Sequence, residues 1–464
     1  MPHDTRPLSN AQMRDIEALL HPYTNAETHR KVGAHLIESG EGVYVYDDQG
    51  NRFIEGMAGL WCAGLGFADA ELIDAAKAQL DRLPYYHLFG GRTHEPAIEL
   101  AEKIKDMLPV PMSRVFYCSS GSEANDTQVK LIWYAMNSMG KPEKKKIISR
   151  RKGYHGVTLV AASMTGLPTN HNSFDLPFDF VKHTATPHYW REGRDGETEE
   201  EFSKRLAAEL EELIIAEGPD TVAAFIAEPV MGAGGVIPPP KGYFEAIGPV
   251  LKKYDVFCVA DEVITGFGRT GNWFGTETYN VPATSVSMAK QLTASYAPLS
   301  AVAINAEMAD AIEAESARQP VLGHGYTYGG HPLGCAVGCA TLDIYKKRDI
   351  LGHVRKVAPK FEAHMKRLEE HPLVGEARVS GLMAGLELSP DPASAAAFKA
   401  PGKVAAKVQQ ELMGHGVIVR PIMDTVAFCP PMIITEDEID ALFEPVEKAL
   451  DAAHHWAKAE GHYD

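Results

Sequence analysis

The chain has 464 residues, 45% of them hydrophobic, so its length predicts two domains with enough apolar material for a large core. It has 45 basic and 62 acidic residues, and the resulting net charge of −17 argues against nucleic acid or an anionic membrane as a partner. The polar start MPHDTRPLSN has no apolar core, so no targeting signal is expected, and no stretch reaches the roughly 20 apolar residues of a spanning helix.

The cysteines do not form a metal-binding pattern. There are six, they include no CxxC pair, and Cys335 and Cys339 lie one helical turn apart, where core packing is the better interpretation. No metal is therefore predicted, and a reducing cytoplasm is the expected compartment.

Residues 1–69 are predicted to be an N-terminal segment that joins the smaller of the two domains. A helix is expected near 10–20, and a hairpin follows because Val43, Val45 and Phe53 alternate around a DDQGN turn. The stretch GMAGLWCAGLGF is interpreted as a loop that holds Trp61 near a cavity, with a buried structural tryptophan as the alternative.

Residues 70–331 are predicted to be the large domain, because strands alternate with helices and this favours a mainly parallel sheet with ligands at its carboxyl ends. Helices are expected at 70–83, 95–108, 123–140, 204–216 and 242–254, and strands at RVFYC, KIISR, VAAFIAEP, VFCVADEV, 283–289 and LSAVAI. A long irregular loop containing HGYTYGGHP is expected after LSAVAI.

Residues 332–464 are predicted to form a smaller α+β domain. Helices are expected at 334–347, 352–370 and 403–414, with short strands in VGEARVSGLMAGLEL, VIVRP and TVAFCPP. Thr435 and Glu438 form a capping box that is expected to open a single last helix, with Ile439, Leu442, Phe443, Val446 and Leu450 on one face.

The stretch 255–290 carries the candidate chemistry. The buried strand VFCVADEV ends in Asp261 and Glu262, and Lys290 follows a second apolar run. This arrangement suits pyridoxal phosphate (PLP), since a lysine forms a Schiff base with the cofactor aldehyde and a carboxylate keeps the pyridine nitrogen protonated. On these residues alone, a solvated lysine and a turn-forming aspartate are the commoner interpretation.

Two further motifs concern phosphate binding and dinucleotides. The strand RVFYC, the turn SSGS and the helix after it could present free backbone N–H groups to a phosphate, although a capping serine without a ligand explains SSGS alone better. The sequence GFGRTG at 266–271 matches the dinucleotide fingerprint GxGxxG, but NWFGTETYNVP follows it in place of a helix. NAD or FAD is therefore not expected.

Six motifs in order make the chain resemble a class III (omega) aminotransferase from about Leu60 onward. They are SSGSEAND (119–126), GYHG (153–156), AEPVMGAGG (227–235), DEVITGFGRTG (261–271), SMAKQLTASYAPLSAV (287–302) and HGYTYGGHPLG (324–334). The resemblance implies PLP fold type I, with a mainly parallel seven-stranded sheet in the large domain. It also implies a homodimer with shared active sites, and leaves a tetramer open.

The resemblance also assigns site residues. Lys290 is expected to hold PLP as an internal aldimine and to move the proton, while Asp261 pairs with the ring nitrogen. Tyr154 and Val263 are expected on opposite faces of the ring. The other implied cofactor contacts are Ser120, Gly121 and Ser122 at the phosphate, His155 as a partner of Asp261, Glu228 as a supporting carboxylate, and Thr327 reaching the phosphate from the other subunit.

Substrate selection is inferred from departures from the family pattern. Arg420 lies where the family binds a substrate carboxylate. Ala233 and Ile264 replace a glutamate and a glutamine of the ornithine and 4-aminobutyrate branches, and both changes resemble the amine:pyruvate branch. The expected walls of the substrate pocket are Trp61, Phe89 from the partner chain, Tyr154 and, as an added wall, Tyr23.

The sequence thus predicts an omega-aminotransferase that moves an amino group from a primary amine or omega-amino acid to pyruvate by a ping-pong mechanism. An aminomutase or decarboxylase of the same fold and a non-enzymatic PLP-fold protein are the alternatives. Taurine, β-alanine, diamines and aryl-alkyl amines stay open as donors, as does the stereopreference. Gln291 and Ser300 stand where glycine is common in the family, and no effect is predicted for them.

Overall fold

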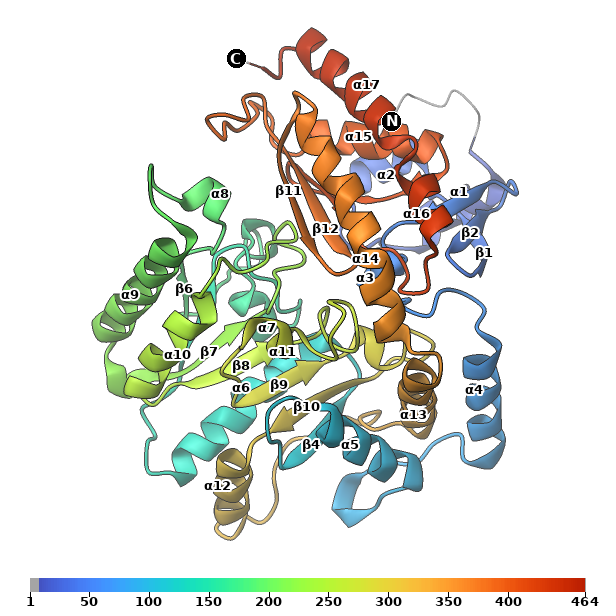
Figure 1. Ribbon diagram of the computed structural model, residues 1–464. Coiled ribbons are helices and arrows are strands. Elements are labelled where there is room, and N and C mark those ends of the chain that lie inside the picture. The colour runs from blue at the N-terminus through green and yellow to red at the C-terminus, as the bar shows by residue number, and fades with distance from the viewer. Residues whose placement is uncertain (1–7, 464) are drawn as a thin grey trace.

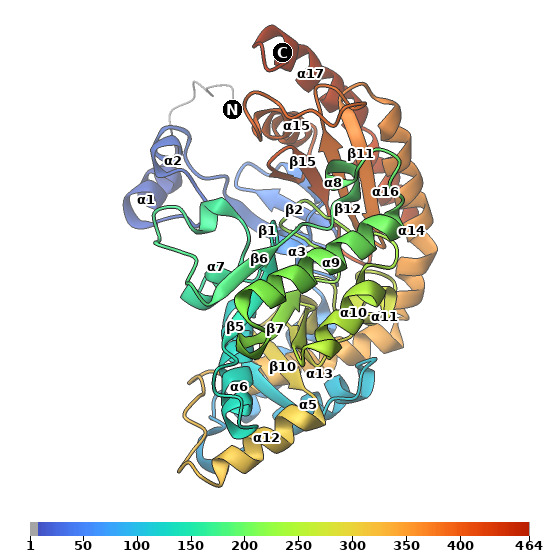
Figure 2. The ribbon, with the colours of Figure 1, turned by 90° about the vertical axis from the view of Figure 1, so that its left-hand side faces the viewer.

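The computed structural model describes residues 8–463 and is built around a seven-stranded sheet with helices on both faces (Figures 1 and 2). The strand order is β4-β10-β9-β8-β7-β5-β6, and only β10 runs antiparallel to its neighbours. The strands are β4 (Arg114–Cys118), β5 (Lys146–Arg150), β6 (Val181–Thr184), β7 (Val222–Ala227), β8 (Phe257–Asp261), β9 (Ser285–Met288) and β10 (Ser300–Ile304).

Alternating side chains of the central strands point into two separate cores. Phe225 and Cys258 belong to the core that holds α9 and α10, whereas Ile226 and Val259 belong to the one that holds α6 and α12. A strand that is apolar on both sides is therefore buried by helices on both sides, as parallel sheets require. The helices of this part are α4 (Ala70–Arg82), α5 (Glu95–Met107), α6 (Gly121–Ser138), α7 (Leu159–Met164), α8 (Tyr189–Glu192), α9 (Glu199–Glu217), α10 (Tyr243–Lys253), α11 (Gly275–Tyr279), α12 (Ala306–Ser316) and α13 (Pro332–Lys347).

Two smaller sheets lie beyond the carboxyl ends of the parallel strands. One, of order β1-β2-β3-β13, pairs the N-terminal hairpin with a C-terminal strand, and the other, β11-β12-β15-β14, is antiparallel throughout. Their strands are β1 (Ile37–Glu41), β2 (Tyr44–Asp47), β3 (Arg52–Glu55), β11 (Val374–Ser380), β12 (Met383–Leu388), β13 (Val417–Ile418), β14 (Arg420–Ile422) and β15 (Thr425–Phe428). The remaining helices are α1 (Asn10–Ala18), α2 (Ala26–Val32), α3 (Ala58–Trp61), α14 (Ile350–Arg367), α15 (Lys403–Gly414), α16 (Glu436–Phe443) and α17 (Val446–Ala459).

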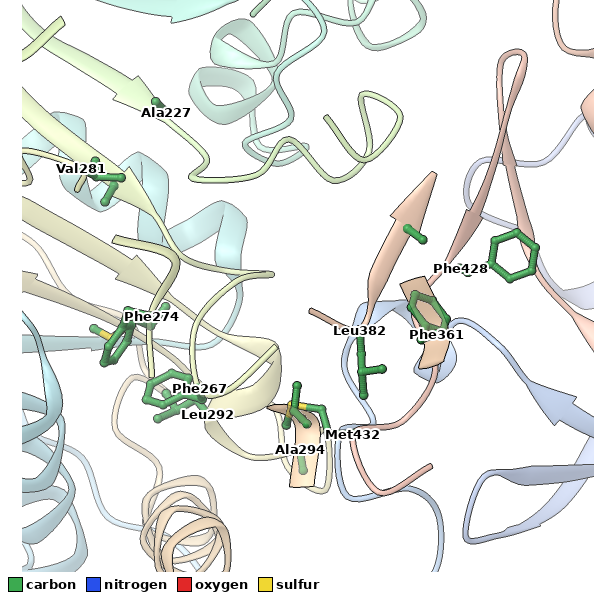
Figure 3. Packing of buried hydrophobic residues seen from close by; sticks show 14 of the residues in the cluster. Ala227, Phe267, Phe274, Val281, Leu292, Ala294, Phe361, Leu382, Phe428 and Met432 are labelled. Carbon is green, nitrogen blue, oxygen red and sulfur yellow. The ribbon is translucent and has the colours of Figure 1, made fainter. Parts of the chain in front are cut away.

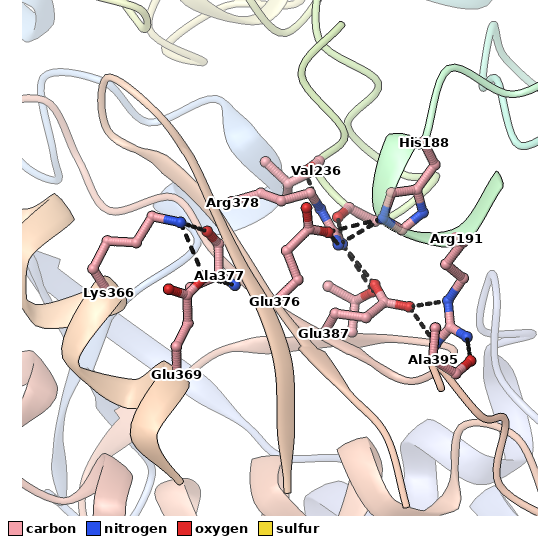
Figure 4. A network of polar contacts seen from close by, with 12 residues as sticks. His188, Arg191, Val236, Lys366, Glu369, Glu376, Ala377, Arg378, Glu387 and Ala395 are labelled. Carbon is pink, nitrogen blue, oxygen red and sulfur yellow. Dashed lines mark hydrogen bonds and ion pairs between the residues drawn. The ribbon is translucent and has the colours of Figure 1, made fainter. Parts of the chain in front are cut away.

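The large sheet region and the C-terminal sheet are held together by apolar and by polar contacts. In Figure 3, Met432 of the C-terminal part lies beside Ala294, and both belong to the same core cluster as Phe267 and Leu292. Figure 4 shows the polar contacts, which join β11 and β12 to α8 and to the loop carrying Val236. Among residues 8–463, no helix is both long and apolar enough to cross a membrane.

The structure corrects two of the expected elements. The stretch after β10 is not irregular throughout, because α12 begins at an Asn305 cap and buries Met308 against the α6 side of the sheet. The last helix is two helices, since Pro445 lies between α16 and α17 and proline cannot continue the helical hydrogen bonds. The capping box at Thr435 is present. The boundaries at 69/70 and 331/332 stay a prediction.

Several elements had not been expected from the sequence. They are the edge strands β1 and β6 and the short helices α2, α7, α8 and α11, all of seven residues or fewer. The loop holding Trp61 contains a helical turn, α3, that is interrupted by non-helical backbone at Gly59 and Leu60. Elements this short carry too few apolar repeats to be recognised by periodicity.

Candidate active site

A cavity of about 210 Å³ lies at the carboxyl ends of the parallel strands β7, β8 and β9. This is the edge at which open α/β sheets bind ligands. Segments from the N-terminus and from the C-terminal sheet complete its wall. The lining residues are Tyr23, Leu60, Trp61, Gly121, Ser122, Asn125, Tyr154, His155, Gly156, Glu228, Ala233, Asp261, Val263, Ile264, Ala289, Lys290 and Arg420.

Asp261 is the last residue of β8 and is almost completely buried. Its Oδ2 accepts a hydrogen bond from Asn125 Nδ2 at 2.7 Å and lies 2.7 Å from His155 Nδ1, and its Oδ1 accepts from the Val263 backbone at 3.1 Å. Three contacts fix the carboxylate in one orientation. Glu262, the other acid of this strand end, lies outside the cavity and accepts from the backbone at the start of α11, including Gly275.

Lys290 follows β9 and faces the same cavity. Its backbone is left-handed, with φ of +46°, a conformation that costs energy for a residue with a Cβ and often marks a functional site. Burial lowers the pKa of its amine, an effect partly opposed by Asp261 and Glu228. Across residues 8–463, the amine forms no ion pair or hydrogen bond with another side chain.

The turn before α6 forms an anion cradle. The Ser120 side chain caps the helix by accepting from Glu123, and the backbone N–H groups of Gly121 and Ser122 have no acceptor within the described part of the chain. Both residues line the cavity, whereas Ser120 does not. A Cβ on Gly121 would stand 3.1 Å from a methyl group of Val263, so a side chain here would crowd Val263 at the cavity wall. Free N–H groups at a helix start suit a phosphate.

Glu228, Tyr154 and Arg420 form other parts of the wall. Glu228 is buried, accepts from the backbones of Tyr154 and Gly232 at 2.9 Å each, and has a raised pKa because it is desolvated. Burial acts in the opposite direction on the basic Arg420 and lowers its pKa. The guanidinium of Arg420 has no ion pair with any carboxylate of residues 8–463. Ala233 also lines the cavity and offers no acid to it.

Gln291 and Ser300, for which the sequence predicted no effect, connect the segments of the site. Gln291 Nε2 donates to the Trp61 carbonyl at 3.1 Å, and the hydroxyl of Tyr345 donates to the Gln291 carbonyl at 3.0 Å. Ser300 Oγ donates to the Ser120 carbonyl at 2.7 Å. The Gln291–Trp61 contact ties the Trp61 loop to the residue next to Lys290, and the Ser300–Ser120 contact ties β10 to the anion cradle.

Besides Ser120, two other expected residues, Phe89 and Thr327, do not line the cavity of their own chain. Phe89 is 49% exposed and lies beside the segment containing Gly325, and Thr327 is also exposed. The expectation that a second subunit brings them to the cofactor stays a prediction.

Asn125 is the residue that sequence reasoning missed. It lies within the quoted SSGSEAND motif, one helical turn after the cradle, and its amide donates both to Asp261 and to the His155 carbonyl at 2.7 Å. Its position in the first turns of a helix that starts at the sheet edge was a usable signal. Its Oδ1 and the Nε2 of His155 are buried without partners among residues 8–463.

The donor set of the cavity fits PLP. An amine, a fixed carboxylate and free N–H groups at a helix start match the aldehyde, ring nitrogen and phosphate of that cofactor. Gly121 and Ser122 line the cavity, and their N–H groups, which have no acceptor among residues 8–463, are available to an anion there. The fold and the cavity together define a PLP protein of fold type I.

Comparison with known proteins gives the family. The model named Aminotransferase class-III matches residues 25–450, and the chain belongs to this family of PLP-dependent aminotransferases. It is 47% identical over 435 residues to gamma-aminobutyrate transaminase 1, mitochondrial, of Oryza sativa subsp. japonica, covering 94% of this chain and 84% of that protein. A gamma aminobutyrate transaminase 1 of Solanum lycopersicum is 47% identical over 433 residues, covering 93% and 84%.

Solved structures agree with this assignment. The omega transaminase from Pseudomonas jessenii in complex with PMP has a TM-score of 0.95 and 49% identity, over 97% of this chain and 99% of that one. A transaminase with L-ala has a TM-score of 0.88 and 50% identity, over 92% and 99%. The predicted family, fold and cofactor are confirmed, and the reaction is amino-group transfer.

Proposed function

We propose that this aminotransferase moves an amino group from an omega-amino acid or another primary amine to pyruvate, which becomes alanine. The supporting observation is Arg420, which faces the cavity without an ion pair from residues 8–463. A guanidinium of this kind suits a substrate carboxylate, which it can bind through two parallel hydrogen bonds. Among the cavity-lining residues of the described range 8–463, Arg420 and Lys290 are the only arginine and lysine, so one cation remains for one carboxylate, as in pyruvate.

The residues of the chain divide the chemical work. When bound, PLP supplies an electron-withdrawing ring and an aldehyde that can carry an amino group. Asp261, oriented by Asn125 and His155, offers a carboxylate oxygen to a protonated ring nitrogen. Gly121 and Ser122 offer backbone N–H groups to the phosphate. The lowered pKa of Lys290 favours a neutral amine, which can accept a proton from the substrate carbon and return it.

The donor is proposed to be an amine with an apolar part next to the reacting carbon. Leu60, Trp61 and Tyr154 give the cavity an apolar wall, which accepts a carbon chain or a ring. Relatives named gamma-aminobutyrate transaminase make 4-aminobutyrate the first donor to test. The structure containing L-ala supports alanine as the product of the other half-reaction.

A homodimer is part of the proposal. Phe89 and Thr327 are exposed, and so are the neighbouring aromatic residues Tyr85, Tyr86 and Tyr328. A group of exposed aromatic side chains is typical of a surface that another protein covers. In the proposed dimer, Phe89 of the partner subunit and Thr327 of the partner subunit complete the pocket wall and the phosphate contacts.

A cytoplasmic location is also proposed. All six cysteines are free in the structure, which is consistent with a reducing compartment. The names of two relatives place those proteins in mitochondria and in chloroplasts. The test is therefore to fractionate the source cells and to detect the protein in each fraction.

The reaction is tested with a panel of donors and two acceptors. Purified holoenzyme is incubated with 4-aminobutyrate, β-alanine, taurine, putrescine or an aryl-alkyl amine, together with pyruvate or 2-oxoglutarate. We expect alanine to form at least about tenfold faster than glutamate, because the second carboxylate of 2-oxoglutarate has no cation in the cavity. Faster glutamate formation would overturn the choice of acceptor. Carbon dioxide or a rearranged amine without added keto acid would overturn transfer as the main activity.

A further inference from the structure

The N-terminal segment brings together three side chains that commonly bind metals. Asp15 in α1, His21 in the turn after it and His29 in α2 each contribute one ligand atom, and these three atoms lie within 4.8 Å of one another. His21 Nε2 lies 2.9 Å from Asp15 Oδ1, and His29 Nε2 lies 2.8 Å from Asp15 Oδ2. The two imidazole rings are 4.3 Å apart. The ligand atoms come from three places in the chain and converge on one point.

We propose that Asp15, His21 and His29 form a binding site for a zinc-type divalent cation. Imidazole nitrogen and carboxylate oxygen are zinc ligands, and three protein ligands with one position left for water are a common zinc arrangement. Zinc bonds of about 2 Å in a tetrahedron place the ligand atoms about 3.3 Å apart. The two Asp15–histidine separations of 2.9 and 2.8 Å are slightly shorter than this, and the two histidine nitrogens lie within 4.8 Å of each other. His21 is 30% exposed, which gives an ion and its water access.

A second observation is that this segment has little apolar packing of its own to hold it. Helices α1 and α2 have nine and seven residues, and neither contains a buried residue. Isolated helices shorter than roughly 12–15 residues are marginal in water, and small elements without a core are commonly fixed by a metal or a disulfide. The three ligands connect both helices and the turn between them.

The site lies next to the catalytic cavity. Tyr23 follows His21 by two residues, lines the cavity, and accepts a hydrogen bond from Asn170 at 2.6 Å. Its backbone is left-handed, with φ of +50°. A cation held by His21 and His29 would fix the turn between them, and therefore the position of Tyr23 in the cavity wall.

Zinc retention by the full-length holoenzyme tests the site. The wild type, His29→Gln and a matched control, His364→Gln, are equilibrated with one equivalent of Zn²⁺ and dialysed, and the retained zinc is counted by elemental analysis. His364 also contacts an acid, Asp440 at 2.8 Å, but without a second histidine. We expect one zinc per chain in the wild type and the control and at least about tenfold less in His29→Gln, because a two-ligand site binds weakly.

Hydrogen exchange and cobalt give independent readouts. Zn²⁺ should slow amide exchange in residues 10–32 of the wild type and of His364→Gln, and leave it unaltered in His29→Gln and in Asp15→Asn. Co²⁺ in place of Zn²⁺ should give visible d–d bands in the wild type that both ligand variants lack. Equal zinc in the wild type and His29→Gln, as thiol or cofactor binding would give, overturns the proposal, and so does a wild type that retains none.

Discussion

Two groups of charged side chains lie on either side of the loop that carries Ala233 and Val236. On one side, Lys290 and Arg420 face the cavity without an ion pair from residues 8–463. On the other side, Arg378 bonds Glu376 and Glu387 at 2.6 Å each and donates to the Val236 carbonyl at 2.9 Å (Figure 4). We call Lys290 and Arg420 the open group, because they have no ion-pair partner among residues 8–463, and we call the network around Arg378 the closed network, because its charges are paired.

The pKa directions follow from this difference. Burial lowers the pKa of Lys290 and of Arg420, because little opposes the cost of desolvating a charge. Burial acts on Arg378 as well, but Glu387 and Glu376 outweigh it and raise its pKa. The comparison indicates that the closed network holds the C-terminal sheet against the large sheet region. The guanidinium of Arg420 stays available for a ligand carboxylate, whereas the lowered pKa of Lys290 favours a neutral amine.

The largest expected effect is at the open lysine. Lys290→Ala removes the amine that is proposed to take and return the substrate proton, so the rate of amino transfer should fall by about 10⁴-fold. Initial rates of alanine formation measure this, with the exposed Lys77→Ala as the control. A Lys290→Ala enzyme that keeps a tenth of the wild-type rate would contradict the proton-transfer role.

The closed network should respond in stability. Arg378→Met leaves Glu387 buried without its main cation, and the loss of one partner of a buried pair typically costs about 3–5 kcal/mol of unfolding free energy. Urea unfolding followed by circular dichroism measures the change. Arg318→Met, which removes an exposed pair with Glu315, should cost less than about 1 kcal/mol. Equal losses for the two variants would show that the network does not join the two parts.

The parts of this molecule that could be predicted from sequence are those with a strong local signal. The buried strands leading to Asp261 and Lys290 are continuous apolar runs, and the two residues line one cavity as adjacent strand ends should. The network around Arg378 could not be predicted, because its members are far apart in the sequence and only tertiary packing brings them together.

The same limit explains the missed contacts inside the site. The contact of Gln291 has no local sequence signal, since its partner, the Trp61 carbonyl, is 230 residues away. The helix α12 was missed because its apolar face is made largely of alanine, including Ala309 and Ala311, which gives weak periodicity. The cluster of Asp15, His21 and His29 has no familiar spacing in the sequence, and only the folded arrangement of the N-terminal segment brings the three side chains together.

A buried acid without a cation among residues 8–463, Glu55, should make the unfolding free energy depend on pH. Burial raises its pKa to about 7, and it accepts a hydrogen bond from Gly59 in the loop that carries Trp61. Its unfolded pKa lies near 4.5, so the folded state holds an extra proton between these values and the unfolding free energy falls as pH rises through this window, by about 3 kcal/mol at most. Above pH 7 no further loss is expected from this group.

The measurement is a comparison of urea unfolding at pH 5 and pH 7.5 for the wild type and Glu55→Gln. Histidines titrate in the same window, so the difference between the two proteins isolates Glu55. We expect the pH dependence to be smaller in Glu55→Gln. An identical dependence in both proteins would mean that Glu55 titrates near its ordinary pKa in the folded state.

The smallest expected effect is at Arg420. Arginine is replaced by methionine here, as in the Arg378 variant, so that the two sites can be compared directly. Arg420→Met removes a charged hydrogen-bonding partner of the keto acid, worth about 1.5–3 kcal/mol, so the KM for pyruvate should rise about 10- to 100-fold. Because Arg420 has no ion-pair partner within residues 8–463, its replacement leaves no buried acid unpaired. The unfolding free energy should therefore fall far less than in Arg378→Met. The KM for an amine donor without a carboxylate should rise much less than that for pyruvate. If Arg420→Met destabilised the fold as strongly as Arg378→Met and left the KM for pyruvate at its wild-type value, the two groups of charges would serve the same structural purpose.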